Sequence, residues 1–362
     1  MTLAPFFALL DRARQGTGQA LDAAGLGPVE APFRIATELS GARLRAYQPL
    51  GVARPGPVLL IIPAPIKRAY IWDLLPEVSV LRHCLRRRLR VYLLEWLDPT
   101  PAEDDLGLAD YAARLPRAAL DVIAAETGQD AAILAGHSLG GTLAAIFAAL
   151  HPERVRGLVL VDAPLAFGPE RGGPLAQALA AVPHARVLRA WAGSPVPGSF
   201  IALLSTMAAP EVFVSQRWAD FGVSLADPLA AALHARVERW MFDELAMPGR
   251  LFEETLEHLY REDRLVRGTL NLGGRCARLD QMLSPVFAVV NPAGHVVPPA
   301  SVLEGLAAMP ATVSRRVLRY DTGEPGPVLQ HLGPLLGRAA HACLWPEILD
   351  WMPAPWSANS AR

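Results

Sequence analysis

The sequence predicts an α/β fold, with a mostly parallel central sheet flanked by helices and a mainly helical segment inserted into it. Short apolar runs typical of buried strands alternate with longer helical patterns in the first half of the chain, and this order produces a parallel sheet. The alternation stops after residue 164, and strand-like runs return only near residue 285. A length of 362 residues is long for one compact domain and short for two ordinary domains. This length favours one large domain with an insertion.

Two antiparallel strands are expected after Pro32, because polar and apolar residues alternate along FRIATELSGARLRAYQPL. The proline-bounded run PVLLIIPAP and the run RVYLLEW are typical of buried strands, and the helical pattern YIWDLLPEVSVLRHCLRRR lies between them. The same order continues with the helix LADYAARLPRAALDVIAAETG, the strand AAILA, the helix LAAIFAALHPERVRG and the strand GLVLVDAP.

The positions at which the alternation of strands and helices stops and resumes predict the domain organisation. Residues 165–278 show no strand periodicity and hold tryptophans in a helical, proline-punctuated context, so they are predicted to form an inserted cap. Strands return at PVFAVVN and SRRVLRYDTG, before a final helix near HACLWPEILDWM. We therefore expect a helical segment at 1–31, a core of 32–164 and 279–352, and a loosely held tail at 353–362.

Composition excludes several classes of function. Hydrophobic residues make up 52% of the chain, and the net charge of -1 gives no basic footprint for nucleic acid or an anionic membrane. Cys84, Cys276 and Cys343 lack metal-site or disulfide spacing, which fits a reducing, cytoplasmic compartment. The apolar start meets Asp11 at once and is predicted to be an amphipathic helix, not a signal sequence. No window approaches the roughly 18 apolar residues of a transmembrane helix.

A candidate nucleophile lies in the pentapeptide GHSLG at residues 136–140. It fits G-x-S-x-G between a strand and a helix, which is the nucleophile elbow of α/β-hydrolases. This turn lifts the Ser138 hydroxyl to the carboxyl edge of the sheet and makes the Leu139 N–H an expected oxyanion donor. The second donor is expected after the strand VLLII, where Pro65 has no N–H and Ile66 has one.

Chain order selects the candidate base. In this fold the histidine follows the last strand, which leaves His331 in GPVLQHLGP and His341 in GRAAHACLWPE. We favour His331, because it lies in a Gly- and Pro-rich loop, and expect His341 on a helix face. His137 is expected to pack beside the elbow, while His295 follows the strand FAVVN close to where the acid belongs.

The orienting carboxylate is not where the fold usually has it, since NPAGHVVPP contains neither Asp nor Glu. Three substitutes are available: Asp162 at the end of GLVLVDAP, Asp321 at the end of the last strand, and Asp280 before PVFAVV. We favour Asp162, because its strand ends at the same edge of the sheet as the elbow. A carboxylate that only caps the turn is the alternative interpretation of this residue.

From PFRIATELS onward the chain resembles the poly(3-hydroxyalkanoate) synthases, most closely the two-subunit type. The resemblance rests on PAPIKRAYIWDLLPEVSVLRHC, GHSLGGTLAAIFAALHPERVRGLVLVDAP, VERWMFDELAMPG, LYREDRLVRGTLNLGGRCARL and GHVVPPAS. It implies the α/β-hydrolase fold, acyl transfer through an acyl-enzyme, and dimers formed partly through the cap. It implies no metal and no resident cofactor, with coenzyme A as the leaving group of an acyl-CoA substrate.

The departures from that family concern the catalytic residues. The family has G-x-C-x-G-G at the elbow, where this chain has Ser138, and an aspartate before its H-x-V-P-P block, where this chain has Gly294. His331 inherits the histidine role, although Gln330 replaces a family glycine. A thiolate exchanges acyl groups with thioesters readily, whereas a serine forms an oxygen ester from which back-transfer of a polymer is harder. Attack of water on the acyl-enzyme is then a plausible fate.

Three functions are compatible with these residues. The favoured one is a serine acyl hydrolase or acyltransferase that acts on hydroxyacyl-CoA thioesters or oligoesters and uses Asp162 or another acid. The second is a polyhydroxyalkanoate synthase with a swapped nucleophile. The third is a catalytically weak synthase-like subunit that binds a true synthase or the polymer granule surface through its N-terminal helix and cap. The expected location is the cytoplasm, with the granule surface as an additional site.

Overall fold

The core of the protein is one eight-stranded, twisted sheet. The computed structural model describes residues 2–47, 56–321 and 331–352. The strands follow the order β1-β2-β4-β3-β5-β6-β9-β10, in which β1, β2 and β4 pair antiparallel and all other neighbours are parallel. Their bounds are Phe33–Leu39 (β1), Ala42–Tyr47 (β2), Val58–Ile61 (β3), Arg90–Trp96 (β4), Ala132–His137 (β5), Val155–Val161 (β6), Val286–Val290 (β9) and Arg315–Arg319 (β10). The predicted α/β class with a mostly parallel sheet is confirmed.

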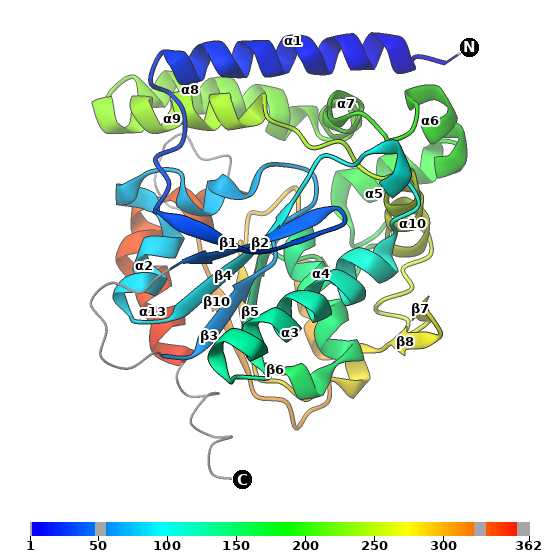
Figure 1. Cartoon of the computed structure of the whole chain (residues 1–362). Coiled ribbons are helices and arrows are strands. Elements are labelled where there is room, and N and C mark those ends of the chain that lie inside the picture. The colour runs from blue at the N-terminus through cyan, green and yellow to red at the C-terminus, as the bar shows by residue number, and fades with distance from the viewer. Residues whose placement is uncertain (1, 48–55, 322–330, 353–362) are drawn as a thin grey trace.

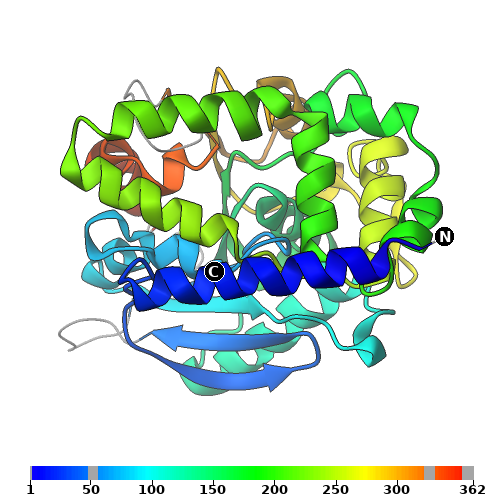
Figure 2. The ribbon, with the colours of Figure 1, turned by 90° about the horizontal axis from the view of Figure 1, so that it is seen from above.

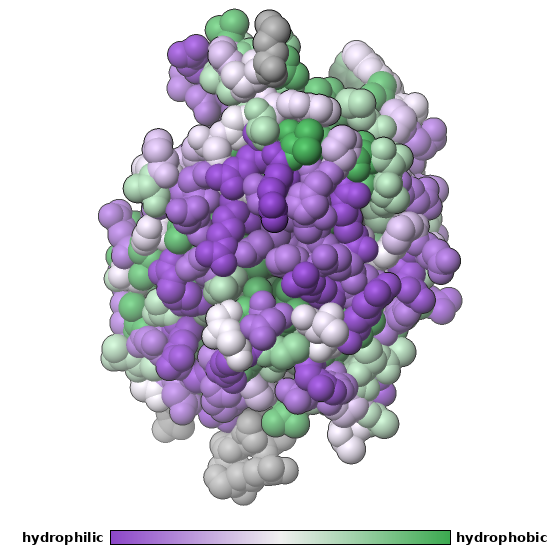
Figure 3. All heavy atoms as spheres, turned by 90° about the vertical axis from the view of Figure 1, so that its right-hand side faces the viewer, coloured by the Kyte–Doolittle hydropathy of each residue, from purple (hydrophilic) through white to green (hydrophobic). Residues whose placement is uncertain are grey.

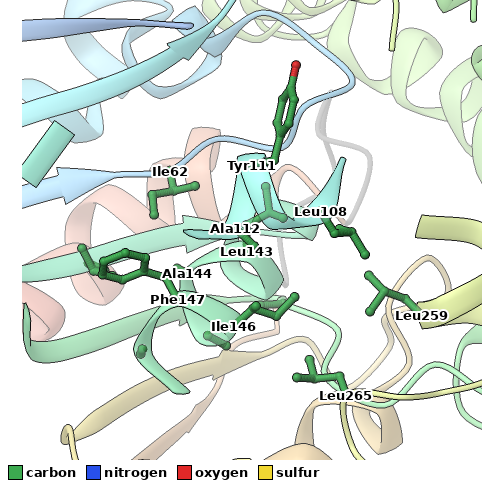
Figure 4. Packing of buried hydrophobic residues seen from close by; sticks show 14 of the residues in the cluster. Ile62, Leu108, Tyr111, Ala112, Leu143, Ala144, Ile146, Phe147, Leu259 and Leu265 are labelled. Carbon is green, nitrogen blue, oxygen red and sulfur yellow. The ribbon is translucent and has the colours of Figure 1, made fainter. Parts of the chain in front are cut away.

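Helices cover both faces of this sheet (Figure 1). One face packs against α3 (Leu115–Thr127) and α4 (Leu139–Leu150), and the other against α2 (Val80–Arg86), α12 (Gly333–Leu336) and α13 (Trp345–Trp351). Alternate strand residues enter the two cores, which is the period that a sheet buried on both faces requires. Figure 4 shows Ile62, Ala144 and Phe147 in the first of these cores.

The cap rises from the sheet between β6 and β9. Its helices are α5 (Gly173–Ala181), α6 (Ala185–Ala192), α7 (Gly198–Ala208), α8 (Arg217–Ser224), α9 (Pro228–Met241) and α10 (Gly249–Glu254). The N-terminal helix α1 (Ala4–Ala23) lies across these helices, as Figures 1 and 2 show from two directions. The helix before β1 therefore packs on the cap, although the two are far apart in the sequence.

Two local expectations were wrong. The stretch expected as one helix before β4 begins with two 3₁₀ turns, Ala69–Asp73 and Pro76–Val78, because Pro76 forces Leu75 into an extended conformation and only α2 is α-helical. The segment 165–278 also contains the hairpin of β7 (Leu270–Leu272) and β8 (Arg275–Ala277), closed by a Gly-Gly turn with positive φ. Strands of three residues are too short to give a periodic pattern.

Among the described residues, no single helix is long and apolar enough to cross a membrane. Segments 198–208 and 211–224 meet that test only as a pair bent by 102°. The expected tail, 353–362, and Gln330 lie outside the described residues.

The contact between the elbow helix and the loop after β3 generates a stability prediction. A Cβ on Gly140 would lie 2.2 Å from the carbonyl oxygen of Ile62, a backbone atom that cannot turn aside. We expect Gly140→Ala to lower the free energy of unfolding by about 2 kcal/mol or more, in line with overpacked cores. Urea denaturation of the purified variant measures the loss.

The matched control is Gly222→Ala in α8, where a Cβ would meet nothing within 4 Å. This helical alanine should stabilise the chain by about 0.5–1 kcal/mol. Equal effects of the two substitutions would contradict the close packing assigned to Gly140.

Candidate active site

Ser138 occupies a strained turn between β5 and α4. Its φ is +54° and its ψ is -135°, a conformation that a non-glycine residue adopts rarely. The turn is held on both sides, because the Ser138 N–H donates to the Val161 carbonyl (3.0 Å) and the Ser138 carbonyl accepts the N–H of Gly141 (2.9 Å). The side chain is half-buried and the helix begins directly after it. This is the geometry that the G-x-S-x-G pattern predicts.

Asp162 joins the carboxyl ends of two neighbouring strands. It follows β6, has a φ of +42° and is only 2% exposed. Its N–H donates to the Val289 carbonyl (3.0 Å), and its Oδ1 accepts the N–H of Asn291, the residue after β9 (2.8 Å). Burial raises the pKa of Asp162 to about 7, and the Asn291 N–H opposes this rise only in part.

Asp162 and His331 line the same pocket beneath the cap. The pocket is lined from the core by Asp162, Asn291, Gly294, His295, Val296, Val297 and His331, and from the cap by Val212 and Gln216. His331 is half-buried, and burial together with the neighbouring His137 lowers its pKa well below the ordinary value. A neutral imidazole of this kind is able to accept a proton.

His137 ties this histidine to the elbow. The rings of His137 and His331 lie 4.4 Å apart, and the His137 Nε2–H donates to the His331 carbonyl (2.7 Å). Burial lowers the pKa of His137 to about 4, so the ring stays neutral at physiological pH. Because His137 directly precedes Ser138, the contact fixes the backbone of His331 beside the Ser138 turn. The sequence predicted only a packing role, since the partner lies 194 residues away.

The remaining candidates lie elsewhere or act differently. His341 is in a helical turn, contacts the Leu335 carbonyl (2.8 Å) and stacks on His83, away from the pocket. Asp280 precedes β9 and pairs with Arg278 at the surface, which places it at the opposite end of the strand from Asn291. Asp321 follows β10 but does not line the pocket.

The packing around Gly294 explains why no aspartate stands at this position, where the related synthases have one. A Cβ on this residue would lie 2.5 Å from the Val297 carbonyl oxygen and 3.1 Å from that of Asn291. The loop after β9 is therefore folded in a way that leaves no room for an aspartate there. Asp162 reaches the same pocket from the neighbouring strand.

The loop after β3 borders the start of α4, where an oxyanion hole is expected. A Cβ on Gly140 would lie 2.8 Å from the Ala64 nitrogen, so this amide lies beside the elbow. Ile66 is half-buried two residues further on, and its carbonyl accepts the Leu245 N–H (3.2 Å). Among the described residues neither the Ala64 nor the Ile66 N–H donates to a protein acceptor. Ala64 was not among the donors predicted from the sequence, although it lies in the same short loop after β3 as Ile66.

Among the described residues no group of three or more His, Cys, Asp and Glu side chains is arranged to hold a metal ion. The expectation of no resident cofactor stays a prediction.

Comparison with known proteins places the chain in a family. Residues 57–177 match the model of the α/β hydrolase fold. The poly(3-hydroxyalkanoate) polymerase subunit of Haloferax mediterranei is 27% identical over 95% of this chain and 68% of its own length. The corresponding subunit of Synechocystis is 28% identical over 85% of this chain and 81% of its own length. The chain is a poly(3-hydroxyalkanoate) synthase-like α/β-hydrolase. It belongs with enzymes of acyl transfer, as the resemblance implied.

The synthase-like chain also shares its fold with solved structures of lipolytic enzymes. A bacterial membrane phospholipase A superposes with a TM-score of 0.51 at 18% identity, covering 96% of this chain and 94% of that one. The monoacylglycerol lipase of Paleococcus ferrophilus gives 0.52 at 14% identity, with 87% and 99% covered. At these identities the likeness concerns the fold alone. The chain spans 60% of the length of the Haloarcula marismortui polymerase subunit, a further relative at 28% identity.

The raised pKa of Asp162 generates a prediction about stability and pH. The folded chain keeps this carboxyl protonated up to about pH 7, whereas the unfolded chain ionises it near its ordinary value of 3.8. The folded state thus binds more protons in this window, so the free energy of unfolding falls as the pH rises through it, by up to about 4 kcal/mol. Asp162→Asn removes this loss, and asparagine tolerates the positive φ.

Urea denaturation at pH 4 and pH 8 measures the effect. The difference in stability between Asp162→Asn and wild type should grow in favour of the variant at pH 8. Parallel pH profiles for the two proteins would show that the carboxyl does not titrate between these values.

Proposed function

We propose that the chain is a serine acyl hydrolase or acyltransferase that acts on hydroxyacyl thioesters or short oligoesters through an acyl-enzyme on Ser138. The observation that carries the proposal is the shared pocket of Asp162 and His331, held beside the Ser138 turn by His137. In this proposal His331 is the general base, Asp162 orients it, and coenzyme A is a leaving group. No resident cofactor takes part.

The proposed reaction has two stages, acylation of Ser138 and hydrolysis of the acyl-enzyme. Ser138 Oγ attacks the acyl carbonyl while its proton passes to His331, and the oxyanion accepts hydrogen bonds from the Leu139 N–H and from Ala64 or Ile66. His331 gives the proton to the departing sulfur or oxygen as the carbonyl re-forms. Water then attacks the ester with His331 again as base, and the hydroxy acid leaves as Ser138 regains its proton.

Asp162 contributes by its charge. The imidazolium that forms on His331 during attack is stabilised by an ionised carboxylate, and Asp162 is only 2% exposed, which strengthens such an interaction. One oxygen of Asp162 is bound to the Asn291 N–H, which leaves the other for the histidine. Since the pKa of Asp162 is about 7, turnover should rise as the pH passes through that value.

Polymer synthesis is the second candidate, favoured by the relatives, which are poly(3-hydroxyalkanoate) polymerase subunits. A serine ester lies lower in free energy than the acyl-CoA thioester, so return of the chain to a thiol is uphill. Hydrolysis or a single transfer to an acceptor is therefore the better supported fate of the acyl-enzyme.

A binding role is favoured by a different observation. Exposed apolar side chains gather on α1 and on the α7–α8 part of the cap, including Phe6 (60% exposed), Met207 (70%) and Trp218 (68%). The face that carries α6, α10 and the β7–β8 hairpin is mostly hydrophilic by contrast (Figure 3). Under this proposal the apolar part contacts a second copy, a true synthase or the polymer granule. A reducing, cytoplasmic compartment is part of all three candidates, because the three cysteines are unpaired.

Turnover of 3-hydroxybutyryl-coenzyme A by purified protein tests these candidates. Wild type should release coenzyme A together with free hydroxy acid and should react with a fluorophosphonate. Ser138→Ala should abolish the labelling and lower the turnover by at least about 1000-fold, because no nucleophile remains.

Ser138→Cys is the matched variant, since it changes only the attacking atom. It should shift the product from free acid toward insoluble polymer. Insoluble polymer from wild type would favour the synthase, and equal activity of wild type and Ser138→Ala, with no labelling of folded protein, would favour the binding role.

A further inference from the structure

A buried lysine lies directly beside the candidate oxyanion donors. Lys67 follows Ile66 in the loop after β3, and its side chain is only 13% exposed. The Lys67 Nζ donates to Glu244 Oε1 (2.8 Å) and to the Met241 carbonyl (2.6 Å), and lies 5.3 Å from the centre of the Trp240 ring. None of these groups belongs to the pocket described above, so the lysine has no part in the proposed chemistry itself.

The end of α9 and the residues after it (240–245) bind the loop on both sides of Lys67. The Leu245 N–H donates to the Ile66 carbonyl (3.2 Å), and the Trp240 Nε1–H donates to the Arg68 carbonyl (2.8 Å). Lys67 and Glu244 also form an isolated antiparallel bridge. The loop that borders the elbow is thus fastened to the end of a cap helix.

The N-terminal helix reinforces the same cluster. Arg14 of α1 donates to both oxygens of Glu244 (2.5 and 2.9 Å) and to the Met241 carbonyl (2.7 Å). Arg14 and Lys67 therefore share one carboxylate and one carbonyl, although Glu244 is only 5% exposed. Three segments that are far apart in the sequence meet at this carboxylate.

We propose that Lys67 is a positioning residue: through Glu244, and with support from Arg14 of α1, it holds the loop after β3 so that its N–H groups face the acyl oxygen at Ser138. The inference rests on the proposed function, because it concerns the oxyanion hole of that site. A loop has no ladder of hydrogen bonds to fix its amides, and an oxyanion hole tolerates displacements of only about 0.5 Å. The cap and α1 supply the missing restraint.

This role has a signature in the pH dependence. Lys67 faces Glu244 and Asp243 from the segment after α9 and Arg14 from α1, and burial lowers its pKa to about 8 in spite of the two carboxylates. Above that pH the lysine loses its charge and its hold on Glu244, so turnover should fall. Stability should move in the opposite direction, because between about pH 8 and 10.5 the unfolded chain binds more protons than the folded one. A lysine that served only stability would not separate the two trends.

The test compares Lys67→Met, Lys67→Arg and Arg14→Gln with wild type, using turnover of 3-hydroxybutyryl-coenzyme A and the rate of fluorophosphonate labelling. We expect Lys67→Met to lower kcat by about 10-fold or more, part of the loss seen when a donor is removed outright. KM should change by no more than about twofold. The urea midpoint is measured beside it, because Glu244 loses one of its two cationic partners and keeps Arg14. Lys67→Arg should restore kcat and move the alkaline limb above pH 8.

Arg189→Gln is the matched control for Arg14→Gln. Arg189 is 26% exposed, close to the 24% of Arg14, and it also joins the cap to the core, through Asp104 (2.5 Å). Its loss should leave kcat unchanged. An equal fall in kcat for Arg189→Gln would overturn the proposal, since any weakened contact of the cap would then suffice.

Two further outcomes separate the inference from the function on which it rests. Full kcat in Lys67→Met, with Ser138→Ala inactive, overturns the positioning role and leaves the serine mechanism intact. Activity that does not depend on Ser138 overturns both. Because a misfolded Lys67→Met would hide its kcat, the alkaline limb of wild type and its shift in Lys67→Arg decide the matter independently.

Discussion

The turn at Ser138 is the constraint on which the rest of the structure depends. A non-glycine residue at φ +54° is held only if the strand before it and the helix after it are both fixed. Here β5 is the centre of the sheet, and α4 begins so close to the loop after β3 that no side chain fits at Gly140. The same closeness brings the Ala64 amide beside the start of α4. In the proposed mechanism, backbone packing and the oxyanion hole are thus one feature of the fold.

The parallel sheet also explains how an acid is available without the usual aspartate. β6 and β9 are neighbours, so the residues that follow them lie at the same edge of the sheet. There the Asn291 N–H, after β9, donates to Asp162, after β6. A carboxylate after β6 therefore reaches the pocket that a carboxylate after β9 would reach. The tight loop at Gly294 and the buried Asp162 belong together: the first closes one route and the second provides the other.

Local patterns predicted the parts of this protein that local patterns determine. The apolar runs of β3, β4, β5, β6 and β9 and the GHSLG turn were identified because burial and backbone strain leave a mark within a few residues. The contact of His137 with His331, the amide of Ala64 beside Gly140 and the β7–β8 hairpin were not. Each depends on segments that are distant in the sequence or too short to show a period. The order of the strands predicted which side chains share an edge, but the pocket that Asp162 and His331 share depends on the three-dimensional packing of the loops and the cap.

Two buried titratable side chains near this edge, Asp162 and Lys67, lower the stability of the fold when they are charged. An ionised Asp162 costs folding free energy because its pKa is raised, and a charged Lys67 does so because its pKa is lowered. In the proposed mechanism both charges nevertheless serve catalysis, because Asp162 shares the pocket of the proposed base His331 and Lys67 lies behind the loop of the proposed oxyanion donors. A chain that only bound a partner through its apolar cap would fold better with neutral side chains at both positions. The coincidence of two unfavourable charges with one strained serine is therefore an argument for chemistry at Ser138.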